Sequence, residues 1–221
     1  MYDAVVFDSD GVLVSRTQYD VLHGAAWAAF DAVGIAEPDP ELVESMVIDV
    51  TPRAVRRVCQ HHGLDPETFW AARDRLSSQR QRAEARAGRK TPYEDVSALD
   101  RLSIPLGVVS SNQQSTVDFL LEHFGLESYF SVAYGRQPTL ESLARKKPDP
   151  YYLNRAVEAL GGESVLFVGD NDSDLQAADN AGVDSAFIRR PHRRDHDPSP
   201  TPTHVVDDLH DIVGLCRSTL A

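Results

Sequence analysis

Cysteine is scarce in this chain, which has only two, and they stand far apart. Cys59 and Cys216 form neither a C-x-x-C pair nor a Cys/His spacing suited to a metal. Disulfide-stapled domains and zinc sites depend on such spacings. The sequence therefore predicts two reduced thiols and speaks against both classes of fold.

Long apolar runs are also absent. No segment approaches the roughly 18 consecutive apolar residues of a membrane span. Met1-Tyr2-Asp3 leads directly into a strand-like segment, without the basic region or apolar core of a signal peptide. We therefore expect no membrane partner and a cytoplasmic location.

Basic residues are in the minority. The 22 lysines and arginines face 34 aspartates and glutamates, which gives a formal net charge of −12, and only Lys90, Lys146 and Lys147 are lysines. Such a surface repels the phosphates of a nucleic-acid backbone. We expect no nucleic-acid partner. Composition leaves a high-salt habitat and a genomic base bias equally open as the origin of the acidity.

What the chain does contain is an acidic motif close to residue 1. Ala4 to Phe7 is a short apolar run typical of a buried parallel strand, and Asp8 and Asp10 follow where that strand would end. Gly11 allows a sharp turn and a close approach of the backbone to a ligand. Open α/β sheets bind ligands at this edge, although Asp-Ser-Asp-Gly is also ordinary turn chemistry.

Residues 15–92 show only helical patterns. The expected helices run from Leu22 to Gly34, from Glu41 to Met46, from Pro52 to Gly63 and from Pro66 toward Ala87. Basic residues dominate the end of the last one, and such charge runs are typical of a solvated helix face. A cationic face that attracts an anionic substrate is the alternative. The basic residues are Arg73, Arg75, Arg80, Arg82, Arg86, Arg89 and Lys90.

After Pro92, strands and helices alternate. Strands are expected over 104–109, 131–134, 165–169 and 183–188. Helices are expected before Gly125, over 148–160, and from a capping box at Ser173-x-x-Gln176 to Gly182. This alternation predicts an α/β fold with a doubly wound parallel sheet. Residues 1–14 and 93–221 would form this core domain, and residues 15–92 a helical cap domain inserted after its first strand.

More polar residues fall at equivalent places in this pattern. Ser110 follows the second clear strand, Asp170 ends a later one, and Asp174 comes four residues after it. Lys147 stands directly before the proline that opens a helix. In a parallel sheet Ser110 and Asp170 share one carboxyl edge with Asp8 and Asp10, which is an active-site arrangement.

Four motifs of the chain occur in the order and approximate spacing of a known family. The chain therefore resembles the haloacid dehalogenase superfamily, in the phosphatase-type subgroup that has a helical cap after the first motif. The motifs are Asp8-Ser9-Asp10-Gly11-Val12-Leu13, Val108-Val109-Ser110-Ser111-Asn112, Lys147-Pro148-Asp149-Pro150 and Val168-Gly169-Asp170-Asn171-Asp172-Ser173-Asp174.

The resemblance implies a phosphatase that acts on a small phosphorylated metabolite. Asp8 would attack phosphorus and form an aspartyl-phosphate, and Asp10 would act as general acid and then as general base. Ser110 and Lys147, with backbone N–H groups around Gly11 and Ser111, would hold the phosphoryl oxygens.

A cation is also expected at this edge. Carboxylates around a phosphate dianion repel it by roughly 4 kcal/mol per unit-charge pair at 4 Å in an effective dielectric of 20. Mg²⁺ suits the side chains of Asp8 and Asp170, and the family adds the main-chain carbonyl of Asp10. Asp174 would orient either Lys147 or a metal-bound water. Between the two neighbouring lysines, we prefer Lys147 to Lys146 as the phosphate ligand.

Other activities fit the sequence less well than phosphate-ester hydrolysis. Dehalogenases of the superfamily lack the second aspartate of the first motif, and phosphonatases need a cap lysine, which residues 15–88 do not contain. A β-phosphoglucomutase-like phosphotransferase is an alternative suggested by Tyr19, although Asp20 stands where those enzymes carry a histidine. A non-catalytic phosphoacceptor switch is a second alternative, against which Asp10 and the inserted cap argue.

Substrate choice is less well defined. Asp20 and Arg53 are candidates for contact with the leaving group from the cap, while the substrate and the oligomeric state stay open. Residues 189–196 contain two histidines and precede three prolines. We expect a mobile loop there, with a His-rich metal site as the alternative.

Overall fold

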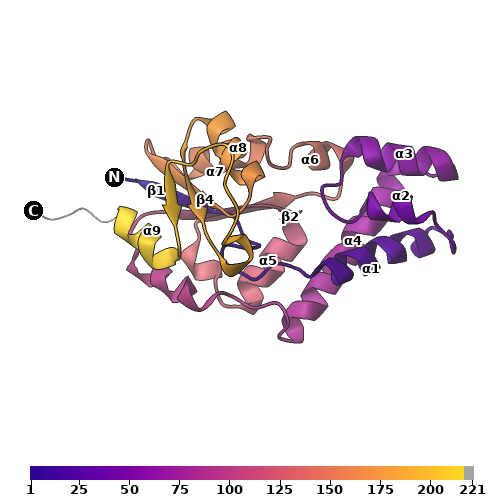
Figure 1. Cartoon of the computed structure of the whole chain (residues 1–221), viewed down its shortest axis with the longest axis horizontal. Helices are drawn as coiled ribbons and strands as arrows, with labels where there is room; N and C mark the ends of the chain where they lie inside the picture. Colours follow the sequence, from indigo (N-terminus) through magenta and orange to yellow (C-terminus); the bar gives the residue numbers. More distant parts are fainter. Residues whose placement is uncertain (217–221) are drawn as a thin grey trace, which may run out of the picture.

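Six parallel strands form the central sheet of the computed structural model, which describes residues 1–216 (Figure 1). Their order in the sheet is β3-β2-β1-β4-β5-β6. This arrangement confirms the predicted α/β fold with a doubly wound parallel sheet. The strands are β1 (Ala4–Phe7), β2 (Leu106–Gln113), β3 (Val132–Arg136), β4 (Val165–Gly169), β5 (Asp184–Ile188) and β6 (His204–Val206).

Strand β1 lies at the centre because its four residues are all apolar and all buried. Its last residue, Phe7, pairs with Val108 of β2 on one side and with Val168 of β4 on the other. A strand enclosed on both faces needs such a continuous apolar run. Asp8 is therefore delivered to the middle of the sheet's carboxyl edge.

Helices cover both faces of the sheet. Val5 and Phe7 belong to an apolar cluster with residues of α5 and α9, whereas Ala4 and Val6 belong to another with residues of α7 and α8. Successive strand side chains point to opposite faces, so this division is what a doubly wound sheet requires. The helices after β2 are α5 (Gln114–His123), α6 (Leu140–Ala144), α7 (Tyr151–Leu160), α8 (Asp172–Ala181) and α9 (Leu209–Cys216).

Between β1 and β2 the chain forms a helical block, defined here as residues 19–86, which extends away from the sheet in Figure 1. Its apolar cluster, which includes Phe30, Phe69 and Trp70, also contains Leu140 and Leu143 of α6. No helix among residues 1–216 is long and apolar enough to cross a membrane. The block consists of α1 (Tyr19–Ala32), α2 (Pro40–Glu44), α3 (Pro52–His62) and α4 (Pro66–Arg86).

Two chain segments connect the block to the sheet, and they run side by side. The Ser15 N–H donates to the Thr91 carbonyl over 2.8 Å, and Val14 forms an antiparallel bridge with Pro92. Both segments therefore cross at one narrow place next to the end of β1.

Two local predictions were wrong. Helix α8 begins at Asp172 with Asn171 as its N-cap, and Asp174 completes the capping box by accepting from the Asn171 N–H over 3.0 Å. Ser173 lies inside the first turn, so it cannot cap the helix. Strand β2 continues beyond Val109 to residue 113 because an irregularity in its pairing with β3 follows Val109.

Candidate active site

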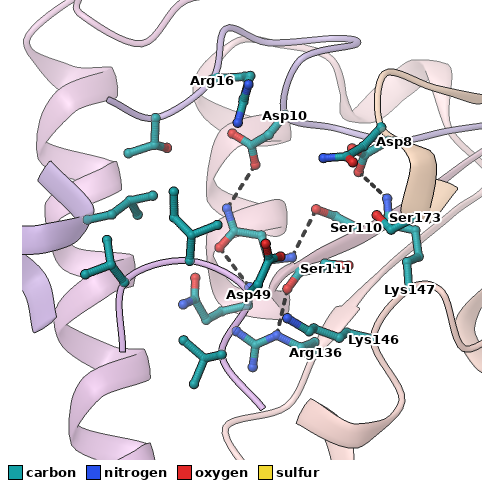
Figure 2. Close-up of a pocket in the computed structure, with 18 of the residues that line it drawn as sticks. Asp8, Asp10, Arg16, Asp49, Ser110, Ser111, Arg136, Lys146, Lys147 and Ser173 are labelled. Atoms are coloured by element: carbon teal, nitrogen blue, oxygen red, sulfur yellow. Dashed lines mark hydrogen bonds and ion pairs between the residues drawn. The ribbon is translucent and has the colours of Figure 1, made fainter. Parts of the chain in front are cut away.

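A cavity of about 730 Å³ separates the carboxyl edge of the sheet from the helical block. Residues after β1 and β4 and at the C-terminal end of β2 line one side, and residues of α1, α4 and the loop between α2 and α3 line the other (Figure 2). Seven of the candidate residues from the sequence line this cavity. They are Asp8, Asp10, Ser110, Ser111, Lys147, Asp170 and Asp174.

Lys147 joins two of the predicted carboxylates. Its Nζ lies 2.8 Å from Asp8 Oδ1 and 2.6 Å from Asp174 Oδ1, and all three side chains are buried. The other Asp174 oxygen accepts the N–H groups of Asp170 and Asn171 at the start of α8. Asp174 is thus fixed by the helix cap, and it holds Lys147 against Asp8.

Asp8, Asp170 and Asp174 form a buried carboxylate cluster. One ligand atom from each lies within 4.8 Å of the others. Burial raises the pKa of Asp8, and Asp174 and Asp170 raise it further, against the opposing effect of Lys147. Burial alone would lower the pKa of Lys147, but Asp174 and Asp8 hold it above the ordinary lysine value. The cluster brings carboxylate oxygens of three residues together, and oxygen donors of this kind fit Mg²⁺.

Gly11 makes room for this cluster. Its φ is +89°, and a Cβ built on it would lie 2.4 Å from Asp170 Oδ2. Any other residue there would strain the turn and displace Asp170. The Gly11 N–H, which was expected to bind phosphate, instead donates to the Val14 carbonyl over 2.7 Å and closes the turn.

Asp10 is paired with a lysine that the sequence analysis placed on a solvated helix face. That prediction was wrong for Lys90, which is 1% exposed and forms an ion pair with Asp10. Lys90 also donates to the Ser15 carbonyl over 2.7 Å. The Asn112 side chain donates to the other Asp10 oxygen over 3.0 Å, so each oxygen of the carboxylate has a partner.

The phosphate-binding candidates on β2 have different surroundings. Ser110 is 3% exposed, and its hydroxyl accepts the Asn112 N–H over 3.2 Å. The Ser111 carbonyl accepts from Arg136 Nε over 2.7 Å. Both residues lie in the irregular part of β2, which turns them toward the cavity.

The cap candidates do not meet the cavity. Asp20 is exposed on α1, where its carboxylate accepts the N–H of the next residue, and Arg53 is exposed on α3. Neither lines the cavity. The helical block instead contributes Tyr19, Arg73 and the loop around Asp49.

A second buried charge cluster contributes Arg73 and Arg136 to the lining of the cavity. Asp74 of α4 lies 2.8 Å from the guanidinium of Arg136, which comes from β3, and 3.8 Å from that of Arg73. Arg73 also donates to two main-chain carbonyls of the loop after α2. Burial lowers the pKa of Arg73 to about 10, Asp74 opposes this, and Arg136 adds to it. Sequence reasoning missed this cluster, because Arg73 was assigned to a solvated face.

Lys146 lies next to this second cluster. Figure 2 shows it beside Arg136 and Ser111, turned away from Lys147. Among residues 1–216 its Nζ has no hydrogen bond and no ion pair, whereas both arginines have hydrogen bonds and an ion pair with Asp74. Burial lowers the pKa of Lys146, Asp49 opposes this, and the two arginines lower it further.

Comparison with known proteins assigns the chain to a family. The model of the haloacid dehalogenase-like hydrolases matches residues 5–188. The chain is 29% identical over 200 residues to a phosphoglycolate phosphatase of Rhodobacter capsulatus, covering 88% of this chain and 87% of the relative. It is 27% identical to the pyrophosphatase PpaX of Halalkalibacterium halodurans, covering 96% of this chain and 97% of the relative.

The fold agrees with this assignment. The solved structure of CbbY from Rhodobacter sphaeroides in complex with phosphate superposes with a TM-score of 0.71 at 20% identity, covering 96% of each chain. A family model that spans most of the sequence, with the family's motifs gathered in one cavity, identifies the protein: it is an enzyme of the haloacid dehalogenase-like hydrolase family.

Proposed function

We propose that this enzyme is a Mg²⁺-dependent phosphatase that hydrolyses a small phosphomonoester through an aspartyl-phosphate on Asp8. The observation that carries the proposal is the pairing of Lys147 with Asp8 and Asp174 beside Asp170. In this arrangement Asp8 would be the nucleophile, Lys147 the fixed cation beside it, and the carboxylates the ligands of a metal ion. Relatives named as phosphatases and pyrophosphatases support phosphoryl chemistry.

The side chains of Asp8 and Asp170 and the carbonyl of Asp10 would hold the Mg²⁺. When bound, the ion offsets the charge of the carboxylates and polarises a phosphoryl oxygen. Lys147 and the Ser110 hydroxyl would bind the remaining phosphoryl oxygens, with the main chain of Ser111 beside them.

Asp8 and Asp10 of the first motif have separate roles in the proposed reaction. A carboxylate oxygen of Asp8 bonds to phosphorus while the bond from phosphorus to the ester oxygen breaks. Asp10, acting in its protonated form, would give a proton to the departing oxygen. It then takes a proton from the water that attacks the aspartyl-phosphate, which releases phosphate and restores Asp8.

We further propose that residues 15–92 act as a cap on a core made of residues 1–14 and 93–221. Residues of the cap and of the core both line the cavity, and the chain passes from one to the other at two adjacent segments. Closure would exclude water during the first step and leave the core residues to perform the chemistry.

The wall opposite Asp8 favours a substrate with a second anionic group. Lys146 is a half-buried cation without a partner among the described residues, next to two arginines whose hydrogen bonds are engaged. A carboxylate or second phosphate on the substrate would pair with it. Phosphoglycolate, the substrate in the name of several relatives, carries such a carboxylate.

The first test is phosphate release from an aryl phosphate and a panel of metabolite phosphates, with and without Mg²⁺. The wild-type enzyme is compared with Asp8→Asn and Asp10→Asn. Metal-dependent turnover that both substitutions abolish is the expected result. Folded protein that binds Mg²⁺ but turns over no substrate, or equal turnover in Asp8→Asn, would contradict the proposal.

A further inference from the structure

The histidine-containing segment after β5 is part of the active-site wall. Its short helical turn η3 (Pro191–Arg193) is anchored by Arg190, which donates to the Val12 carbonyl over 2.6 Å. Arg190 also forms an ion pair with Asp95 at 2.7 Å and stacks 3.9 Å above the Tyr93 ring. The segment is therefore held against the end of β1 by several independent contacts.

Two histidines of this segment each contact an aspartate. His192 Nε2 lies 2.6 Å from Asp170 Oδ2, and His192 lines the cavity. His196 Nε2 lies 2.7 Å from Asp172 Oδ1, on a partly exposed carboxylate, and His196 does not line the cavity. The same type of contact thus occurs once inside the site and once outside it.

The cluster of three carboxylates is divided between two sets of partners. Lys147 holds Asp8 and Asp174, whereas Asp170 receives its contacts from the other side, from His192 and, at 3.7 Å, from the Arg193 guanidinium. Without this second set, Asp170 would be a buried carboxylate free to rotate beside two others. Repulsion would then turn it out of the position that a cation needs.

We propose that His192 is a positioning residue for the metal site. By holding one oxygen of Asp170, it fixes the carboxylate and leaves the other oxygen for the cation, an inference that rests on the proposed function. Partners that orient a metal ligand in this way typically contribute a factor of roughly 10 to 100 in metal affinity. The histidine-rich stretch would accordingly serve the aspartate site, and within residues 1–216 its histidines belong to no cluster of three metal-ligating side chains.

The test is calorimetric titration of Mg²⁺ into the full chain without substrate. His192→Ala is expected to raise the Kd for Mg²⁺ by roughly 10- to 100-fold. His192→Gln, whose side-chain amide still donates to Asp170, is expected to recover part of the affinity. His196→Ala is the matched control and is expected to bind Mg²⁺ as the wild type does, and thermal unfolding without Mg²⁺ checks that each variant is folded.

Three results would overturn the inference. One is an unchanged Kd in folded His192→Ala. Another is an equal loss of affinity in His196→Ala, which would reduce the effect to anchoring of the segment. The third is a directly coordinated histidine nitrogen in the electron spin echo spectrum of the Mn²⁺-loaded wild type, which would make His192 a ligand. A wild-type chain that binds no Mg²⁺ would instead contradict the proposed function, and this inference with it.

Discussion

The two walls of the cavity use charge in different ways. On the sheet side, Lys147 contacts Asp8 and Asp174 directly, at the ends of strands that form the centre of the fold. On the other side, the arginines are bound to Asp74 and to main-chain carbonyls, and the Lys146 Nζ has no partner among residues 1–216. In the function proposed above, the sheet wall would carry out the reaction and the other wall would select the substrate.

The second wall also joins the helical block to the sheet. Asp74 of α4 binds Arg136 of β3 and accepts from Gln113 of β2 over 2.8 Å. Gln81 of α4 donates to Asn112 over 3.0 Å. Polar contacts of this kind are typical of interfaces between parts that move relative to each other.

Asp8→Asn should have the largest effect on the sheet wall. The amide is a poor nucleophile, so kcat is expected to fall by at least about 10⁴-fold, as when other covalent nucleophiles are removed. Steady-state phosphate release measures this, with circular dichroism as the control for folding. Turnover within tenfold of wild type would place the nucleophile elsewhere.

Asp74→Asn should be the most damaging change in the opposite wall. It leaves two buried arginines without a carboxylate, and breaking a buried pair in this way costs about 3–5 kcal/mol of unfolding free energy. Urea unfolding followed by fluorescence measures the loss. The exposed Asp118→Asn on α5 is the control, and an equal loss in both variants would refute the role given to Asp74.

Lys90→Met tests the contact that orients Asp10. Without the ion pair the general acid is less well placed, so kcat should fall by roughly 10- to 100-fold while KM changes little. The neighbouring Arg89→Met is the matched control because the Arg89 side chain is 63% exposed and pairs only with Glu84. A rise in KM with unchanged kcat would show that Lys90 binds substrate instead.

Lys146→Met should have the smallest effect, limited to one class of substrate. A charged hydrogen bond contributes about 1.5 kcal/mol, so KM for a phosphomonoester with a carboxylate should rise by roughly tenfold. A neutral ester of the same size should be unaffected. Arg145→Met, next in the chain but outside the cavity, is the control, and an equal rise for both substrates would remove Lys146 from substrate selection.

The sheet wall could be predicted from sequence because strand ends decide it. Once Ala4 to Phe7 was identified as a buried strand in a parallel sheet, the place of Asp8 followed, and Asp170 followed in the same way from its own strand. Such arguments need only local patterns and the rule that parallel strands end at one edge.

The ion pairs that join the sheet to the helical block and its connecting segments could not be predicted, because they depend on how the block packs against the sheet. The pair of Lys90 with Asp10 and that of Arg136 with Asp74 join residues far apart in the sequence. A run of arginines on a helix does not reveal which of them turns inward, and this is why Arg73 was misassigned. The same limit explains why Asp20 and Arg53, chosen by position in the chain, lie on outward faces of α1 and α3.

Trapping the phosphoryl group on Asp8 tests the central claim most directly. In Asp10→Asn, an aryl phosphate still transfers its phosphoryl group because the phenolate leaves without a proton, but no base activates the water of the second step. Mass spectrometry should then find one phosphoryl group on the peptide that contains Asp8. A folded, Mg²⁺-bound variant that releases the phenolate with no label on Asp8, or with the label on another residue, would contradict the two-step mechanism.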